Sequence, residues 1–446
     1  MANLDIYKLK HIYFIGIGGI SMSALAKIFL NSGVKVSGSD LKNSEQIKKL
    51  CELGATIFIG ENTNNLENDV DLVVYTGAIK ENNLEYQKAK KLGVLLMERS
   101  EFLGELAKGF KNVISIAGTH GKTTTTALIG EIFNNAKKNP TIHIGGVASF
   151  GNIQVGEREY FITEACEYLN SFQYLNSSTA LITNIETDHL DYYKCFDEIK
   201  RAFVDFANNA SKNVITFEND WIYSKLNKFV NYFSCGFSEN YDFYAYNIEK
   251  FKNGYMFDVK FQGELLGRFI IRVAGIHNVK NALCAIAVSY INGISIDIIS
   301  KTIYEFGGVE RRLEVLASKG KSQIIADYAH HPTEIINSLS AFEGKRVLCV
   351  FQPHTYSRTK TLKKEFAGAF KECKKLIIFK TYPAREEFLE EGSETSLFKV
   401  IKHKNKKLLL DKNKLLEEIE REQKNYDVIL ILGAGNIYDI VKKGIK

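Results

Sequence analysis

Short apolar runs alternate with amphipathic segments along the first hundred residues of this chain. We interpret the runs as strands and the segments between them as helices. Alternation of this kind predicts a parallel sheet covered by helices. The expected strands are His11–Gly16, Val34–Ser37, Thr56–Ile59, Leu72–Thr76 and Val94–Met97.

The next part of the chain begins with the same pattern and then changes. From Tyr241 to Val273 apolar and polar positions alternate around the turn signal Lys252-Asn253-Gly254, which predicts a β-meander. Before it, the pattern predicts a long helix near Phe196–Asn209 and strands at Val113–Ala117, Tyr160–Thr163 and Ala180–Asn184.

A glycine pair, Gly307-Gly308, indicates a flexible linker, and the αβ alternation returns after it. We therefore predict an α/β protein with an N-terminal Rossmann-like parallel sheet at residues 1–105, a central domain with a small β-meander at 106–311, and a C-terminal Rossmann-like α/β domain at 312–446. Three domains suit 446 residues. The late strands are expected at Gln323–Ala326, Val347–Phe351, Leu376–Phe379 and Val428–Leu432.

Charge and cysteine content narrow the class of protein. A net charge of +6 suits anionic nucleotide ligands but does not indicate nucleic acid, and we expect the basic cluster Lys402–Lys407 to be a solvated surface turn. Seven cysteines without a C-x-x-C pair fit a reducing cytoplasm. No signal pattern and no apolar stretch of ~20 residues is present. We expect a cytoplasmic monomer or homodimer without membrane insertion.

The strongest chemical signal follows the expected strand Val113–Ala117. Gly118-Thr119-His120-Gly121-Lys122-Thr123 leads through Thr124 into a helix, so unpaired backbone N–H groups point at an anion. Lys122, which we expect to be exposed, supplies an ammonium for the β- and γ-phosphates of a nucleotide, and Thr123 a hydroxyl for Mg²⁺. Ile116 replaces the first glycine of the usual motif, so the loop is a variant. The alternative is a glycine turn that only caps a helix.

A second glycine motif ends the first expected strand. Gly16-Ile17-Gly18-Gly19-Ile20-Ser21, with Asp40 closing the next strand, approximates a dinucleotide-binding fingerprint. A pyrophosphate over this turn is one interpretation, and NAD or a purely structural turn are the others. The stronger phosphate loop downstream argues against an NAD enzyme.

Polar residues follow two further strands of the central domain. Glu164 ends one strand, and His189 lies soon after the next. The carboxyl ends of adjacent strands converge in a doubly wound sheet, so the two side chains are candidates to hold Mg²⁺ with Thr123. In the alternative, Glu164 and Glu167 are ordinary strand-end charges and His189 caps a helix.

These motifs, in this order, resemble the Mur ligase family, ATP-dependent amide-forming enzymes of peptidoglycan precursor synthesis with the signature G-T-x-G-K-[ST]. Within it, His11–Asp40, Asp327–Ile335 and Gln352–Arg358 resemble the branch that adds L-alanine to UDP-N-acetylmuramate. The resemblance implies a P-loop ATPase-like central domain and a ligase that joins L-alanine to the lactyl carboxylate through an acyl phosphate. The small-molecule substrates would be ATP, UDP-N-acetylmuramate and L-alanine, and Mg²⁺ the cofactor.

The resemblance also implies roles for single residues. It assigns catalysis to Lys122, Glu164, His189 and Arg312, with Arg312 meeting the ATP phosphates on closure, and Mg²⁺ to Thr123, Glu164 and His189. The ATP contacts are Gly118, Thr119, His120, Gly121, Lys122, Thr123, Thr124, His277, Asn278, Asn281, Arg312, Asp327 and His330. The UDP contacts are Gly16, Gly18, Gly19, Ser21 and Asp40, and the amino-acid side holds His354 and Arg358. Thr355 stands where some relatives carry an arginine, so the ligand of the alanine carboxylate stays open.

Three alternatives remain at this point. The chain is a related ligase that adds another amino acid or a peptide, although the D-N-P-R string of the diaminopimelate-recognising branch is absent. A folate-type ligase is disfavoured by the N-terminal glycine motif. A P-loop switch is disfavoured because the chain has no N-K-x-D guanine signature.

Overall fold

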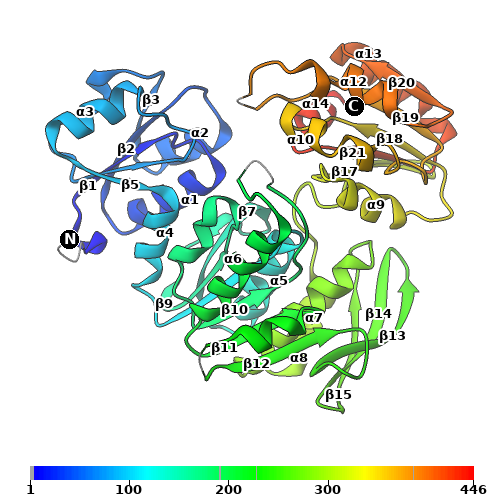
Figure 1. Cartoon of the computed structure of the whole chain (residues 1–446), viewed down its shortest axis with the longest axis horizontal. Coiled ribbons are helices and arrows are strands. Elements are labelled where there is room, and N and C mark those ends of the chain that lie inside the picture. The colour runs from blue at the N-terminus through cyan, green and yellow to red at the C-terminus, as the bar shows by residue number, and fades with distance from the viewer. Residues whose placement is uncertain (1–4, 190–191, 228, 385, 446) are drawn as a thin grey trace. The chain divides into compact units, whose positions relative to one another are not determined.

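The computed structural model describes residues 5–189, 192–227, 229–384 and 386–445. Their helices and strands form three separate sheets (Figure 1), which confirms the α/β prediction. By compactness the chain divides into two units. One unit comprises 1–246, 258–269 and 281–303, and the other 247–257, 270–280 and 304–446. The predicted boundaries at 105/106 and 311/312 stay a prediction.

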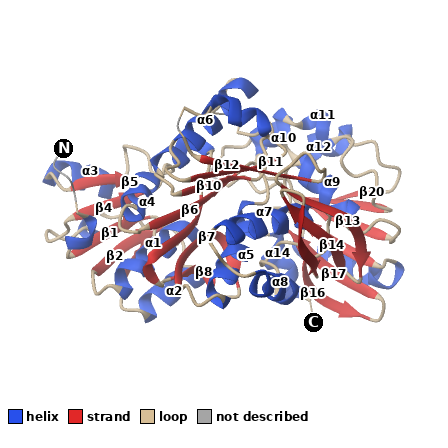
Figure 2. Ribbon diagram, turned by 90° about the horizontal axis from the view of Figure 1, so that it is seen from below, coloured by secondary structure: helices blue, strands red, loops and turns tan. Residues whose placement is uncertain are grey.

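The first sheet is wholly parallel, with strand order β3-β2-β1-β4-β5. Along β1, Ile12 and Phe14 pack with α1, α2 and α4, whereas Tyr13 and Ile15 pack with α3 on the opposite face. Burial on both faces explains the continuous apolar run and fits a Rossmann-like sheet between helices (Figure 2). The elements are β1 His11–Ile15, α1 Ile20–Asn31, β2 Lys35–Asp40, α2 Glu45–Glu52, β3 Thr56–Ile59, β4 Leu72–Tyr75, α3 Leu84–Leu92, β5 Leu95–Glu98 and α4 Arg99–Ala107.

The second sheet has ten strands in the order β15-β14-β13-β12-β11-β10-β6-β9-β7-β8. Strand β6 lies between β10 and β9, parallel to both, so the loop that follows β6 lies beside the ends of two neighbours. The predicted meander is confirmed as β13, β14 and β15. The elements are β6 Asn112–Ala117, α5 Lys122–Asn135, β7 Pro140–Ala148, β8 Gly151–Gln154, β9 Glu157–Glu164, β10 Thr179–Ile182, α6 Phe196–Asn208, β11 Asn213–Phe217, β12 Asn231–Gly236, β13 Phe243–Phe251, β14 Gly254–Phe261, β15 Glu264–Ile271, α7 His277–Ile291 and α8 Ile296–Glu305.

The third sheet has the order β16-β17-β21-β18-β19-β20, and all of its pairs are parallel except the edge pair β16–β17. On β18, Cys349 and Phe351 face one apolar core, and Leu348 and Val350 face the other. The elements are β16 Glu314–Lys319, β17 Ser322–Asp327, α9 Pro332–Ser340, β18 Val347–Phe351, α10 Tyr356–Thr361, α11 Lys363–Phe366, β19 Lys375–Phe379, α12 Glu394–Val400, β20 Lys406–Leu409, α13 Lys412–Glu422, β21 Val428–Leu432 and α14 Ile437–Gly444. Short 3₁₀ helices are η1 Ile6–Lys8, η2 Thr63–Asn65, η3 Tyr168–Tyr174, η4 Asp220–Lys225, η5 Glu390–Gly392 and η6 Gln423–Asn425.

Every strand predicted from an apolar run is present, but six others were missed: β7, β8, β11, β12, β16 and β20. Strand β7 opens with Pro140 and contains two glycines, a composition typical of loops. The expectation of a surface turn across Lys402–Lys407 was wrong at its end, because Lys406 and Lys407 begin β20. Across the described residues, no helix combines the length and apolar character needed to span a membrane.

A buried histidine joins β7 to two other elements of the same compact unit. His143 is 3% exposed, and its Nδ1 lies 3.0 Å from the Thr163 hydroxyl on β9. Its Nε2 lies 3.0 Å from the Ser21 hydroxyl on α1. Burial, assisted by the charge of Arg99, lowers the pKa of His143 to about 3. The imidazole of the folded protein is therefore neutral near pH 7.

This burial makes stability depend on pH. An unfolded chain protonates His143 near its ordinary pKa of about 6.5, while the folded chain does so only near 3. The stability that depends on a neutral His143 is therefore fully present above pH ~6.5. The free energy of unfolding decreases as the pH falls below that value, because the unfolded chain binds a proton that the folded chain does not. Between pH 7 and 5 the free energy of unfolding of His143→Gln should fall by roughly 2 kcal/mol less than that of the wild type. Urea titrations at both pH values measure the difference, and equal falls would contradict the burial of a neutral imidazole.

Candidate active site

The predicted phosphate loop runs from the end of β6 to the start of α5. Helix α5 begins at Lys122, and Gly121 precedes it with φ 85°, in the left-handed region that favours glycine. A Cβ on Gly121 would stand 2.5 Å from the Asn281 Oδ1 atom. Glycine is therefore required here for both conformation and space, and Asn281 on α7 lies directly against the loop.

The chain beyond β10 braces this loop through Asn184. The Thr119 N–H donates to the Asn184 carbonyl at 3.1 Å, and the His120 N–H donates to its side-chain oxygen at 2.9 Å. The Asn184 amide donates in return to the His120 carbonyl at 2.8 Å. These two loop N–H groups already have protein partners. An anion would meet the first N–H groups of α5 instead, at Lys122, Thr123 and Thr124.

Lys122 folds back over the loop, and the expectation that it is exposed was wrong. Its ammonium donates to the Gly118 carbonyl, to the Thr119 carbonyl at 3.3 Å and to Glu167 Oε2 at 2.9 Å. The side chains of Lys122 and Glu167 are only 16% and 4% exposed. Burial disfavours the charge of Lys122, but the Glu167 carboxylate outweighs it and raises the pKa of the ammonium. Burial is likewise outweighed at Glu167, where Lys122 and His189 lower the pKa of the carboxyl.

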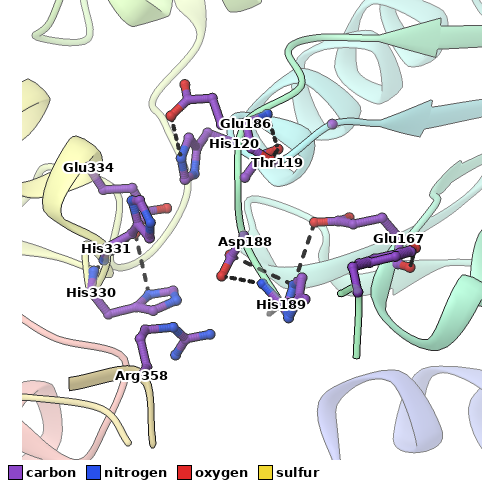
Figure 3. A network of polar contacts seen from close by, with 12 residues as sticks. Thr119, His120, Glu167, Glu186, Asp188, His189, His330, His331, Glu334 and Arg358 are labelled. Carbon is purple, nitrogen blue, oxygen red and sulfur yellow. Dashed lines mark hydrogen bonds and ion pairs between the residues drawn. The ribbon is translucent and has the colours of Figure 1, made fainter. Parts of the chain in front are cut away.

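His189 lies between two carboxylates (Figure 3). Its Nε2 is 3.6 Å from Glu167 Oε1 and 3.8 Å from Asp188 Oδ2, and its ring lies 4.8 Å from that of Tyr168. Of the predicted metal ligands, Thr123 is on the first turn of α5. Glu164 ends β9, where it accepts a hydrogen bond of 2.6 Å from the Gly145 N–H. Glu164 as a ligand stays a prediction, and the carboxylate between Lys122 and His189 is that of Glu167.

The donors at the loop fit Mg²⁺, which prefers oxygen ligands and is held by one or two carboxylates together with phosphate and water. Glu167 is buried, and its lowered pKa keeps it ionised. The Thr123 hydroxyl belongs to the first turn of α5, next in the chain to the Lys122 that Glu167 binds. Among the described residues, one group of three ligand atoms lies close enough for a preformed site, and it is elsewhere: His11, Glu67 and Asp69. The Lys35 ammonium lies 2.6 and 3.0 Å from those two carboxylates, so this group is an ion-pair cluster.

The N-terminal glycine motif forms a tight turn between β1 and α1. The N–H groups of Gly16 and Ile17 donate to the Ser39 carbonyl at 2.8 and 3.0 Å. The Gly18 N–H donates to Asp40 Oδ2 at 2.9 Å, and Gly19 caps α1. Asp40 thus holds the turn, while the Ser21 hydroxyl contacts His143. Direct contacts of Gly16, Gly18, Gly19, Ser21 and Asp40 with a UDP group stay predictions.

The predicted adenine contacts lie at the start of α7. The Asn278 amide donates to the Ala274 carbonyl at 2.6 Å and lies 3.3 Å from the His277 ring. Asn281, one turn further along the helix, reaches the phosphate loop at Gly121. His277 and Asn278 therefore shape the helix start, and their contact with a purine stays a prediction.

In the C-terminal unit, Asp327 anchors the linker. Its carboxylate accepts the Leu313 N–H and the Ala329 N–H, both at 2.8 Å. Burial raises the pKa of Asp327 to about 6 although the Arg312 charge opposes this. The Arg312 guanidinium lies 5.0 Å above the Tyr328 ring. Asp327 therefore fixes the backbone at Leu313, the residue that follows Arg312. Direct contacts of Asp327 or Arg312 with ATP stay predictions.

His330, His354 and Arg358 lie together in this unit. The ring of His354 is 5.8 Å from that of His330 and stacks on Tyr382 at 5.6 Å. Burial, with His330 and Arg358 contributing, lowers the pKa of His354 to about 3. The Arg358 guanidinium donates to the His354 carbonyl at 3.0 Å. A neutral imidazole beside a guanidinium is suited to an amino acid, since the guanidinium matches a carboxylate.

Glu386 holds the loop before Arg358, a contact that sequence patterns did not indicate. It accepts the Thr355 hydroxyl at 2.6 Å and the Ser357 N–H at 2.9 Å. Thr355 is therefore a structural member of this loop.

The Asp327 anchor generates a prediction. In Asp327→Asn the amide nitrogen must face one of the two backbone donors, which leaves a buried N–H unsatisfied. The free energy of unfolding should fall by about 1–3 kcal/mol. Hydrogen exchange at the Leu313 and Ala329 amides, read alongside a urea titration, should become faster. Unchanged exchange and stability would show that the anchor carries no energy.

Comparison with known proteins agrees with this geometry. Three family models match successive parts of the chain: the Mur ligase family catalytic domain at residues 11–111, the Mur ligase middle domain at 116–289 and the Mur ligase glutamate ligase domain at 311–435. The UDP-N-acetylmuramate–L-alanine ligase of Alkaliphilus metalliredigens is 41% identical and covers 99% of this chain and 98% of the relative. The ligase of the same name from Clostridium kluyveri is 42% identical, with 98% of each chain covered.

Solved structures agree as well. The UDP-N-acetylmuramate–alanine ligase MurC of Thermotoga maritima has a TM-score of 0.83 and 27% identity, covering 97% of this chain and 98% of its own. The murein peptide ligase Mpl of Psychrobacter arcticus, with a TM-score of 0.76 and 24% identity over 97% and 98% of the two chains, shares the fold. With its three sheets, its braced phosphate loop and matches over nearly its whole length, this chain belongs to the Mur ligase family.

Proposed function

We propose that this protein joins L-alanine to the lactyl carboxylate of UDP-N-acetylmuramate at the expense of ATP, through an acyl phosphate. One observation carries the proposal: a buried Lys122–Glu167 pair beneath the variant phosphate loop, in a chain that matches relatives of that activity from end to end. The reaction needs a site that binds a nucleotide and neutralises phosphate charge, and this loop supplies both.

In this proposal the ATP phosphates lie at the N-terminus of α5. The Lys122 ammonium, held at the loop by Glu167, turns to the β- and γ-phosphates. Thr123, Glu167 and His189 are the residues that would hold Mg²⁺, with Glu164 as a further predicted ligand. The metal ion would neutralise charge on the β- and γ-phosphates.

Bonds change in two steps. A lactyl carboxylate oxygen attacks the γ-phosphorus while the bond to the β-phosphate oxygen breaks, which gives an acyl phosphate and ADP. The alanine amine then attacks the acyl carbon, phosphate leaves, and the amine proton passes to a base. His189 is a candidate for this base through its Nδ1 atom, because its Nε2 faces Glu167 and Asp188 on the side of the proposed metal site.

The substrates other than ATP are assigned by the remaining motifs. The glycine turn at Gly16–Gly19, at the start of α1, takes the pyrophosphate of the sugar nucleotide. Arg358 takes the carboxylate of L-alanine, with His354 beside it. Arg312 on the linker contributes charge to the transferring phosphate. A cytoplasmic location, where these substrates are available, completes the proposal.

The dependence of phosphate release on UDP-N-acetylmuramate and L-alanine tests the proposed function. Phosphate release should require ATP, UDP-N-acetylmuramate and L-alanine together, because without the amine the acyl phosphate stays trapped. The assay combines ATP and sugar nucleotide with each amino acid in turn and identifies the product by mass. Release that is indifferent to the sugar nucleotide would favour a P-loop switch. Faster release with another amino acid or a peptide would favour a different branch of the family.

Substitution of Lys122 tests the buried Lys122–Glu167 pair. Lys122→Ala should lower ligation by at least roughly a hundredfold, because a charge aimed at the transferring phosphate is lost. It should also destabilise the protein by about 3–5 kcal/mol, because Glu167 is left as an unpaired buried charge.

A double variant and a surface control separate these effects. Lys122→Ala combined with Glu167→Gln should recover stability without recovering activity. Lys108→Ala, which removes a surface partner of Glu105, should change neither. Wild-type turnover in the stable double variant would show that neither Lys122 nor Glu167 takes part in the reaction.

A further inference from the structure

Two consecutive arginines on the linker have different surroundings. Arg311 lies between two aromatic rings, with its guanidinium 4.8 Å from the Tyr328 ring and 5.0 Å from the Tyr438 ring. Its Nη2 donates to the carbonyls of Gly433 and Gly435 at 3.0 and 2.9 Å. A planar guanidinium can stack and donate in this way at once, and an ammonium cannot. Arg311 is thus held by side chains and backbone of its own unit.

The Tyr328 ring is shared with Arg312, whose guanidinium lies 5.0 Å from it. The backbone on either side of Arg312 is left-handed, with φ 60° at Arg311 and 50° at Leu313. Residues other than glycine keep such conformations only where their surroundings impose them. Here the Tyr328 N–H donates to the Arg311 carbonyl at 2.6 Å, and Leu313 is bound by Asp327. The direction of Arg312 therefore depends on contacts made by its neighbours.

The loop that receives Arg311 also contacts the amino-acid side. The Gln352 N–H donates to the Leu432 carbonyl at 2.9 Å, and its side-chain oxygen accepts the Ile437 N–H at 3.0 Å. A Cβ on Gly435 would stand 2.6 Å from the Tyr382 Cβ, whose ring stacks on His354. The segment Gly433–Gly435 thus has Arg311 bound to its carbonyls and the residues that support His354 packed against it.

We propose that Arg311 is a positioning residue: by binding Gly433 and Gly435 and stacking between Tyr328 and Tyr438, it fixes the direction of Arg312 relative to His354. The inference rests on the proposed function, in which Arg312 acts on the transferring phosphate. Arg311 itself contacts only the protein. Its loss should therefore slow the chemical step and leave the binding of ATP to the phosphate loop nearly unchanged.

Substitutions at Arg311 and Tyr328 test the inference. Arg311→Ala should lower kcat by roughly ten- to a hundredfold, since small misplacements of a reacting group have effects of this size. The Kd for ATP, measured by calorimetry, should stay within about threefold because the binding site is intact. Arg311→Lys should recover only part of kcat. Tyr328→Phe, which keeps the ring, should resemble the wild type, and Tyr328→Leu should resemble Arg311→Ala.

A matched control is Arg346→Ala, which removes an exposed arginine bound to Asp427 in the same unit and should leave kcat unchanged. Hydrogen exchange at the amides of residues 311–313 supplies a readout that needs no ligation. It should become faster in Arg311→Ala and Tyr328→Leu. If the wild type ligates no amino acid, the proposed function fails, and this exchange alone decides whether Arg311 holds the linker. Wild-type kcat in Arg311→Ala, or an equal loss in Arg346→Ala, would overturn the inference.

Discussion

The Lys122–Glu167 ion pair is the contact on which the arrangement of this site depends. Two charges that are nearly removed from water attract strongly, yet their desolvation opposes the attraction, so such pairs are weak evidence for stability alone. Here the pair holds the Lys122 ammonium at the phosphate loop. In the proposed function this ammonium turns from the Glu167 carboxylate to the phosphates of ATP. His189 lies against the same carboxylate, which links the lysine to the candidate metal ligands.

The sheet around the pair explains its position. Strand β6 is central, so the loop after it lies beside the ends of β9 and β10. From the β10 side, Asn184 binds the backbone of Thr119 and His120, and from α7, Asn281 fills the space that the missing side chain of Gly121 leaves. The backbone of the loop thus has protein partners before any nucleotide binds. A backbone held in this way does not have to be ordered when the ligand binds.

Much of the fold follows from local patterns in the sequence, because strands buried on both faces must be continuous apolar runs. Such runs located β1, β6, β18 and β21. Three of the missed strands, β8, β16 and β20, lie at sheet edges, where burial is weaker. Strand β7 lies between β9 and β8, but its proline and glycines give it the composition of a loop. In the site, the phosphate loop was predictable from its glycines and lysine. Glu167 was not predicted as a site residue, because the expectation that ligands follow strand ends points to Glu164, the last residue of β9. Glu167 comes three residues later, just before η3 and its left-handed residues Leu169 and Asn170. The burial of Lys122 and the brace by Asn184 are tertiary contacts that no local pattern encodes.

The central claim is that this site activates a carboxylate by transferring phosphate to it. The fate of the carboxylate oxygen tests that claim most directly. UDP-N-acetylmuramate labelled with ¹⁸O in the lactyl carboxylate is incubated with ATP and L-alanine, and the released phosphate is weighed by mass spectrometry. Attack of the carboxylate on the γ-phosphorus predicts that each phosphate carries one labelled oxygen. Phosphate without label, formed at the rate of ATP consumption, would contradict the account.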